Sequence, residues 1–142
     1  MASGGTLIAE GADYIADWPI ICGWGLRRWA EANRPLVVRY IRAMAAATDW
    51  LLLPENREET LRIQMEEENL DRQKAEMAYS RVTPKACVNT AALRKNIEVR
   101  IELGYYKPPH QATEAFYDPS YWCEATGLPA PAPGGMPRNA VS

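Results

Sequence analysis

The stretch WAEANRPLVVRYIRAMAAATDWLLLPENREETL, residues 29–61, decides the fold because it encodes a periodic helix, a stop and a restart. Apolar side chains recur in it at steps of three and four residues, which is the spacing of one helix face. These positions are Leu36, Val37, Tyr40, Ile41, Met44, Leu51 and Leu52. Asn33 can cap the first turn, and Pro35 suits a helix start because its φ is already helical. Pro54 cannot continue a helix, so we expect one amphipathic helix to end near Leu52 and another to begin at Pro54.

Helices are also expected further along the chain, where a capping side chain precedes a helix-forming segment. Their ranges are Pro54–Met65, Leu70–Arg81 with Asn69 as its cap, a helix from Asn89 or Thr90 to Gly104, and a short helix capped by Asp118 with Pro119 at its first position. Two β-prone runs, Thr6–Ala9 and Trp18–Cys22, are candidate short strands. The expected fold is therefore mainly α with one or two short strands.

The anchor stretch also carries a family resemblance. Its successive pieces are Trp-Ala-Glu-Ala-Asn, Arg-Tyr-Ile-Arg-Ala, Ala-Thr-Asp-Trp-Leu-Leu and Pro-Glu-Asn-Arg-Glu-Glu. In this order they resemble the C-terminal half of the nitrate/sulfonate/taurine-type periplasmic solute-binding proteins of ABC transporters. That family includes relatives of the thiamine-pyrimidine-precursor synthases. A looser likeness extends from Leu7 to Tyr121, where residues 117–121 resemble the start of the family's final helix.

The resemblance implies the C-terminal portion of a type II periplasmic-binding-protein α/β fold, whose first half has no counterpart in this sequence. Residues 1–18 would then end the second lobe with its strand, and residues 19–127 would form the crossover strand and the helical layer of the first lobe. Residues 128–142 are rich in Pro, Ala and Gly without periodicity, so we expect a disordered tail. Helices that normally cover a sheet would be left bare, which favours a homo-oligomer or a separately encoded partner half.

Composition narrows the classes of partner. The chain has 47% hydrophobic and 24% charged residues and a net charge of −2, so it lacks the basic surplus of a nucleic-acid-binding protein. It has no apolar run of about 18 residues, so no integral membrane segment is expected.

Residues 1–5 lack the basic and apolar regions of a secretory signal, which indicates the cytoplasm, whereas the resemblance implies the periplasm. Cys22, Cys87 and Cys123 have no metal-site spacing and are expected to be reduced thiols.

Three residues are candidate ligand contacts. The resemblance implies that a ligand lies beside the crossover strand, near Trp18 and Trp24, although Gly23-Trp24-Gly25 also suits a plain strand-to-helix bend. Arg100 falls between two apolar ridges of its predicted helix, so its guanidinium needs a partner. It is either an anchor for a sulfonate, nitrate or carboxylate ligand or one half of an ion pair with a neighbouring helix.

The chemistry of an enzyme is not evident in the sequence. His110 is the only histidine, and no motif places a serine or cysteine beside a base, so neither a catalytic residue nor a metal site is expected. No phosphate-binding glycine motif occurs, and no cofactor is expected. The resemblance implies a non-catalytic solute-binding component of an ABC-type uptake system, with a small anion or aromatic metabolite as ligand and an ABC permease as partner. The alternatives are a helical interaction module or decayed fragment without a ligand, and, less favoured, a thiamine-precursor synthase relative.

Overall fold

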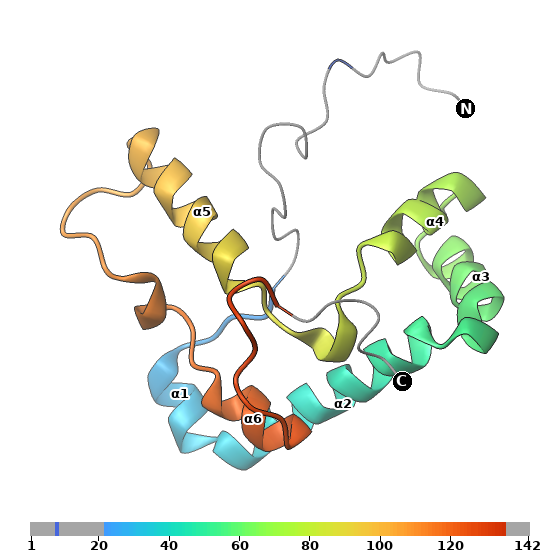
Figure 1. The fold of residues 1–142 in the computed structure, drawn as a ribbon, viewed down its shortest axis with the longest axis horizontal. Helices are drawn as coiled ribbons and strands as arrows, with labels where there is room; N and C mark the ends of the chain where they lie inside the picture. Colours follow the sequence, from blue (N-terminus) through green and yellow to red (C-terminus); the bar gives the residue numbers. More distant parts are fainter. Residues whose placement is uncertain (1–7, 9–21, 136–142) are drawn as a thin grey trace.

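The computed structural model describes Ile8 and residues 22–135, and this part of the chain is mainly helical, as the sequence predicts. No strand occurs among these residues. The candidate strands Thr6–Ala9 and Trp18–Cys22 lie outside the described residues except for Ile8 and Cys22. Figure 1 shows α2 along the lower edge of the molecule, with α1 and α6 near its start and the α3–α4 pair at its far end.

Helix α2 begins and ends close to the residues at which the sequence predicts its start and its end. Helix α1 (Arg27–Ala32) leads into α2 (Arg34–Leu52), which has Pro35 in its first turn and gives way at Leu53 to an extended conformation before Pro54. Asn33 differs from the prediction, because its side chain makes no cap bond to α2. Its Nδ2 instead donates to the Trp29 carbonyl at 2.8 Å, so this side chain closes α1 rather than opening α2.

The apolar stripe predicted on α2 is divided between two faces. Val38 and Ala45 are buried and Ile41 is half-buried, and this face packs against α6 and the 3-10 turn η3 (Pro84–Ala86). Leu36 and Tyr40, which the prediction placed in the same stripe, are exposed. The predicted apolar stripe is therefore only partly buried, because α6 and η3 cover only one side of the helix.

Helix α6 (Ser120–Thr126) provides most of the core that covers α2. Tyr121, Trp122 and Ala125 are buried, and Tyr121 and Ala125 form a cluster with Val38. The Oδ1 atom of Asp118 accepts a bond from the Ser120 N–H at 2.9 Å, which lowers the pKa of Asp118. The helix begins at Ser120 with Pro119 as its N-cap, one residue later than the predicted cap at Asp118.

Cation contacts fasten α6 to the start of α2. The Nε of Arg34 donates to Glu124 at 2.8 Å, and its guanidinium lies 4.3 Å from the centre of the Tyr121 ring. Further along α2, the Nε of Arg42 donates to the Ala125 carbonyl at 3.1 Å. Helix α6 ends at Gly127, whose φ of 73° is accessible to glycine without steric cost.

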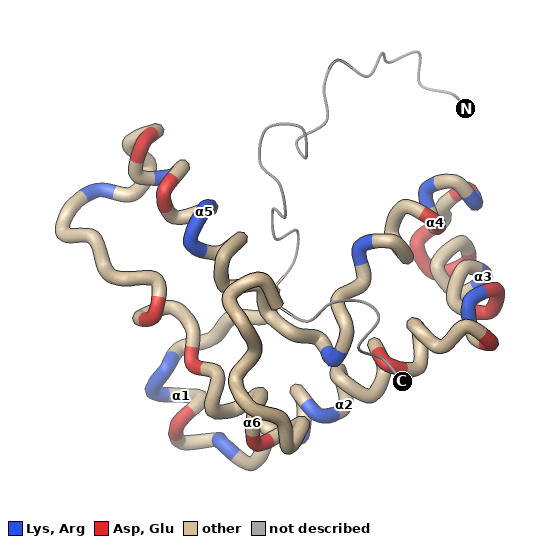
Figure 2. The backbone as a smooth tube through the Cα atoms, viewed as in Figure 1, with Lys and Arg blue, Asp and Glu red and all other residues tan. Residues whose placement is uncertain are grey.

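At the C-terminal end of α2, η2 (Pro54–Asn56) leads into a pair of short helices, α3 (Arg57–Glu67) and α4 (Arg72–Ser80). Leu61 and Ala75 are fully buried in this part of the molecule. The cap of α4 is Asp71, which accepts a bond from the Lys74 N–H, and not Asn69 as predicted. Figure 2 shows that positions occupied by charged residues follow one another closely along the backbone of this helix pair.

Helix α5 (Thr90–Glu102) agrees closely with its sequence signals. The Asn89 side chain accepts a bond from the Ala92 N–H at 2.9 Å, and Gly104, with φ 72°, follows the end of the helix. The short turn η4 (Thr113–Ala115) packs against this helix.

The segment after α6 is placed against the start of α5. Disorder was expected from Leu128 onward, yet residues 128–135 make defined contacts: the Ala91 N–H donates to the Pro133 carbonyl at 2.7 Å, and the Thr90 hydroxyl donates to the same oxygen at 3.2 Å. The first-turn amides of a helix have no partner within the helix, so a proline-rich segment can satisfy them with its carbonyls. Residues 136–142 lie outside the described residues.

Candidate functional site

The three ligand contacts predicted from the sequence are not brought together in the described part of the chain. Trp18 lies outside the described residues. Trp24 is 92% exposed in the segment before α1. No hydrogen bond or ring contact joins Trp24 to Arg100 within the described residues, and Trp24 does not line the hollow beside Arg100.

Arg100 lies on the surface and not in the middle of a buried face. Its Nε donates to Asn96 Oδ1 at 2.9 Å, one turn earlier on α5. It forms no ion pair with another described residue, so the predicted tie to a neighbouring helix is absent from this part of the chain. The burial prediction failed because few elements cover α5, of whose residues only Ala92 is buried.

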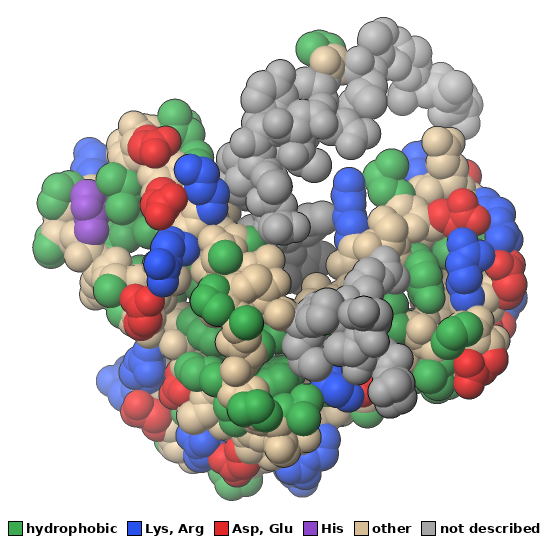
Figure 3. Space-filling view, in the orientation of Figure 1, with side chains coloured by type: hydrophobic (Ala, Val, Ile, Leu, Met, Phe, Trp, Pro, Cys, Tyr) green, Lys and Arg blue, Asp and Glu red, His purple; other side chains and the backbone are tan. Residues whose placement is uncertain are grey.

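A shallow hollow lies beside Arg100. Its lining residues are Val99, Arg100, Leu103 and Tyr105, and its volume is about 330 Å³. A second hollow of about 350 Å³ lies between Trp122 and the proline-rich residues 128–135, where Figure 3 shows hydrophobic side chains gathered over α6. Both hollows are open to solvent, so neither encloses a ligand as a deep pocket does.

The junction of η3 with α2 combines two positive φ angles with several hydrogen bonds. Lys85 and Ala86 have φ values of 53° and 50°, a conformation that residues with a side chain rarely adopt. The Ala86 N–H donates to the Thr48 hydroxyl at 2.9 Å, and the Trp122 Nε1 donates to the Lys85 carbonyl at 2.9 Å. The Lys85 ammonium donates to Asp49 at 2.6 Å. These bonds hold η3 between α2 and α6, which is a structural role.

The Tyr117 hydroxyl is buried and has no hydrogen-bond partner among the described residues, and burial raises the pKa of Tyr117 to about 12. Electrostatic effects of Cys87, Cys123 and Asp118 raise the pKa of Tyr117 further, by less than burial does. A phenol with a raised pKa stays protonated at neutral pH and is a poor general base.

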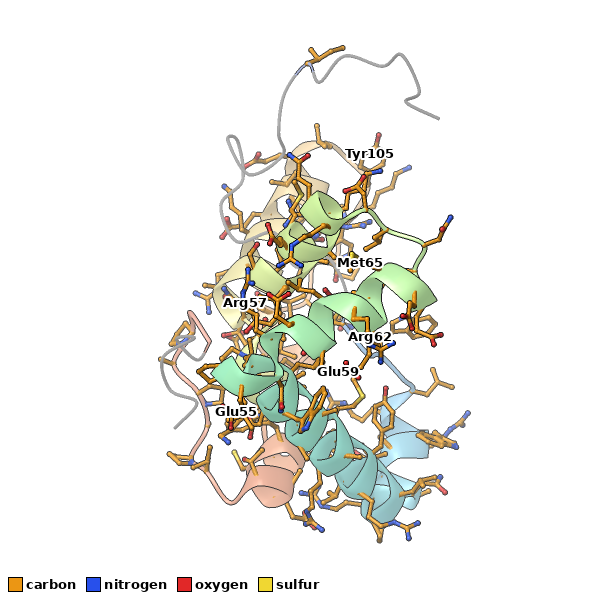
Figure 4. All side chains as sticks on the ribbon, turned by 90° about the vertical axis from the view of Figure 1, so that its right-hand side faces the viewer. Glu55, Arg57, Glu59, Arg62, Met65 and Tyr105 are labelled. Carbon is orange, nitrogen blue, oxygen red and sulfur yellow. The ribbon has the colours of Figure 1, made fainter. Side chains whose placement is uncertain are left out.

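The α3–α4 pair carries a network of surface ion pairs. Arg72 makes two bonds to Glu58, at 3.0 and 2.9 Å, and these lower the pKa of that carboxyl. Arg62 bridges Glu59 and Glu66, and its hydrogen bonds lower the pKa of Glu59. Figure 4 shows Glu59 and Arg62 beside each other on α3. Each of these charges is already paired at the surface, so the network has no unsatisfied carboxylate pair poised for acid–base work.

The face of α2 that α6 and η3 leave uncovered is strongly apolar. Residues on it follow one another at steps of four, three, four and three, which is the spacing of a coiled-coil seam. We call these residues the α2 seam: Leu36, Tyr40, Ala43, Ala47 and Trp50. All five are exposed, including 47% of Leu36, 60% of Tyr40 and 42% of Trp50. The sequence analysis did not identify the seam, because it assigned the apolar residues of both helix faces to one stripe. The alternating steps of four and three residues were the signal that could have revealed it.

Within Ile8 and residues 22–135, no group of three or more His, Cys, Asp or Glu side chains could hold a metal ion. None of the described helices is both long and apolar enough to cross a membrane. Comparisons with protein families, with curated proteins and with solved structures find no match to this chain.

Proposed function

We propose that the chain is a helical protein-interaction module that docks a partner on the α2 seam. The observation that carries this proposal is the exposure of five apolar seam residues on a long helix whose opposite face is already used by α6 and η3. Exposed apolar patches beyond a few hundred Å² are uncommon on monomeric proteins and mark interaction sites.

The size of the seam supports a binding role. Leu36, Tyr40, Trp50 and the adjoining Met44 are 47, 60, 42 and 41% exposed. With about 200 Å² for one large side chain, these four leave roughly 400 Å² accessible. Covering it at about 25 cal/mol per Å² gains roughly 10 kcal/mol before the costs of association, which exceed several kcal/mol.

Site-specific photo-cross-linking tests the proposal. A photoreactive amino acid replaces Tyr40 in the seam, and the matched control carries it at Ala46, which is exposed on the same helix but outside the seam. The seam position is expected to give at least tenfold more adduct in the cell, with the partner identified by mass spectrometry. Equal or absent adducts at the two positions would contradict an interaction role for the seam.

A second candidate function follows from the family resemblance: a non-catalytic solute-binding component of a periplasmic ABC-type uptake system, delivering a small anion or aromatic metabolite to a permease. The hollow beside Arg100 favours it, because an exposed guanidinium next to Tyr105 offers an anion partner and an aromatic wall. Isothermal titration with nitrate, taurine and an aromatic sulfonate tests this role. Binding that is lost in Arg100→Gln but kept in Arg94→Gln, a substitution of another exposed α5 arginine, would support it.

A further inference from the structure

We propose that the partner of the α2 seam is a second copy of this chain, packed with its α2 antiparallel to the first. This inference rests on the proposed interaction role of the seam and adds the identity of the partner and its orientation. It is carried by the order of large and small residues along the seam, by the direction of the helix dipoles, and by the area left exposed.

The seam is self-complementary in one register. In an antiparallel pair, Leu36 of one copy lies opposite Ala47 of the other, and Tyr40 lies opposite Ala43. Trp50 then lies opposite Asn33, at the start of the helix. Each bulky seam residue meets a small or short one, so the side chains can interlock at the density of a protein interior.

A parallel pair would lose this fit. It places Tyr40 opposite Tyr40 and Trp50 opposite Trp50, while Ala43 faces Ala43. Bulky residues would hold the helices apart at two levels, and the alanines between them would leave a void. The seam therefore favours the antiparallel arrangement over the parallel one.

The helix dipoles also favour the antiparallel order. An antiparallel pair opposes the dipoles of the two α2 helices, whereas a parallel pair aligns them.

The exposed area fits a weak dimer. Roughly 400 Å² from the four large side chains of each copy gives about 800 Å² in the pair, and the alanines and the polar rim extend it toward the roughly 1,000 Å² of a small specific interface. We therefore expect dimers that dissociate on dilution and not an obligate assembly.

Cysteine cross-linking of the full chain tests the register. The background carries Cys22→Ser and Cys123→Ser, while the buried Cys87 is left in place. In the antiparallel pair the two copies of residue 43 are offset by three residues, or about 4.5 Å along the axis, so Ala43→Cys is expected to cross-link with a short bis-maleimide. The two copies of residue 36 are offset by eleven residues, or about 16 Å, so Leu36→Cys alone is expected to give at least tenfold less product. A mixture of the Leu36→Cys and Ala47→Cys variants is expected to restore the yield of cross-linked product. Strong cross-linking of Leu36→Cys alone would overturn the antiparallel order.

Light scattering over a range of concentrations tests the dimer itself. The average mass of the native chain is expected to rise toward twice the monomer mass, and Ala47→Glu is expected to raise the dissociation constant at least tenfold. Ala46→Glu places the same charge on the same helix outside the seam and is expected to behave as the native chain. A native chain that stays monomeric at every concentration overturns this inference. If Tyr40 then cross-links to a different protein, the interaction role stands without the self-pairing, and if it cross-links to nothing, both proposals fail.

Discussion

The Lys85 ammonium lies 2.6 Å from Asp49 Oδ2, although 36 positions separate the two residues in the chain. This ion pair joins the η3 turn to the second half of α2 and is more than two-thirds buried on both sides, with side-chain exposures of 27 and 30%. The other carboxylate oxygen of Asp49 is buried, and no hydrogen-bond partner for it occurs in the described part of the chain. The lysine is therefore the main group that stabilises this charge.

Lys85→Met is expected to lower the free energy of unfolding by about 1–2 kcal/mol, because it leaves the Asp49 carboxylate partly buried without its cation. Urea denaturation followed by circular dichroism measures the change. Arg94→Met is the matched control, since the Arg94–Glu114 pair is 59 and 73% exposed. The Arg94→Met substitution should lower the free energy of unfolding by less than about 0.5 kcal/mol. Equal losses for both variants would mean that the Asp49–Lys85 pair is no more important than a surface pair.

Trp122→Phe is expected to lower the free energy of unfolding by about 1–3 kcal/mol, because the Lys85 carbonyl loses its indole donor. Trp122→Ala should cost about 3–5 kcal/mol, since it adds a cavity at a buried position. Trp24→Phe, at a 92% exposed position, serves as the control and should change stability by less than about 0.5 kcal/mol. Chemical denaturation of the three variants measures these changes in the free energy of unfolding and ranks them.

Asn89→Ala is expected to destabilise the chain by about 1 kcal/mol, because the Ala92 N–H loses its cap acceptor at the start of α5. Asn89→Ser keeps an acceptor at the same position and should restore most of this loss. Thermal unfolding followed at the helical band of circular dichroism compares the two. If both substitutions cost the same, the cap bond does not account for the effect.

Tyr117 is expected to make the chain sensitive to alkaline pH. Burial raises its pKa in the folded state from 10.0 to about 12, so the unfolded chain releases this proton first as the pH rises. The contribution of Tyr117 to stability is therefore complete below about pH 10 and is lost as the pH rises to about 12.

Tyr117→Phe should weaken the alkaline loss of stability, because the substituted ring has no proton to release. Unfolding free energies measured by urea denaturation at about pH 9 and about pH 11 give the slope for each variant. Tyr105→Phe, at a 77% exposed position, controls for the loss of a surface phenol. A native slope that survives in Tyr117→Phe would assign the pH dependence to other groups.

The positions of the helices were largely predictable because their signals are local. Pro54 stops α2, Asn89 caps α5 and Gly104 follows its end, as their side chains or backbone preferences dictate. The cap of α4 was placed two residues early, at Asn69 instead of Asp71, because both residue types can cap a helix and only the observed bond to Lys74 distinguishes them.

The candidate sites were less predictable because burial depends on what packs against a helix. Arg100 was expected between two buried ridges, yet α5 buries only Ala92, so the guanidinium lies at the surface. The Tyr117 hydroxyl carried no sequence signal, since the burial of a single atom depends on tertiary packing.

The sequence by itself determined where α2 begins and ends and that it is apolar over much of its circumference, because helix propensity, proline geometry and periodicity act over a few residues. Only the tertiary structure decided which apolar side is core. The packing of α6 and η3 buries Val38 and Ala45 and leaves Leu36 and Tyr40 in solvent. A helix with two apolar faces can bury either one, and the choice is made by long-range contacts that no local pattern records.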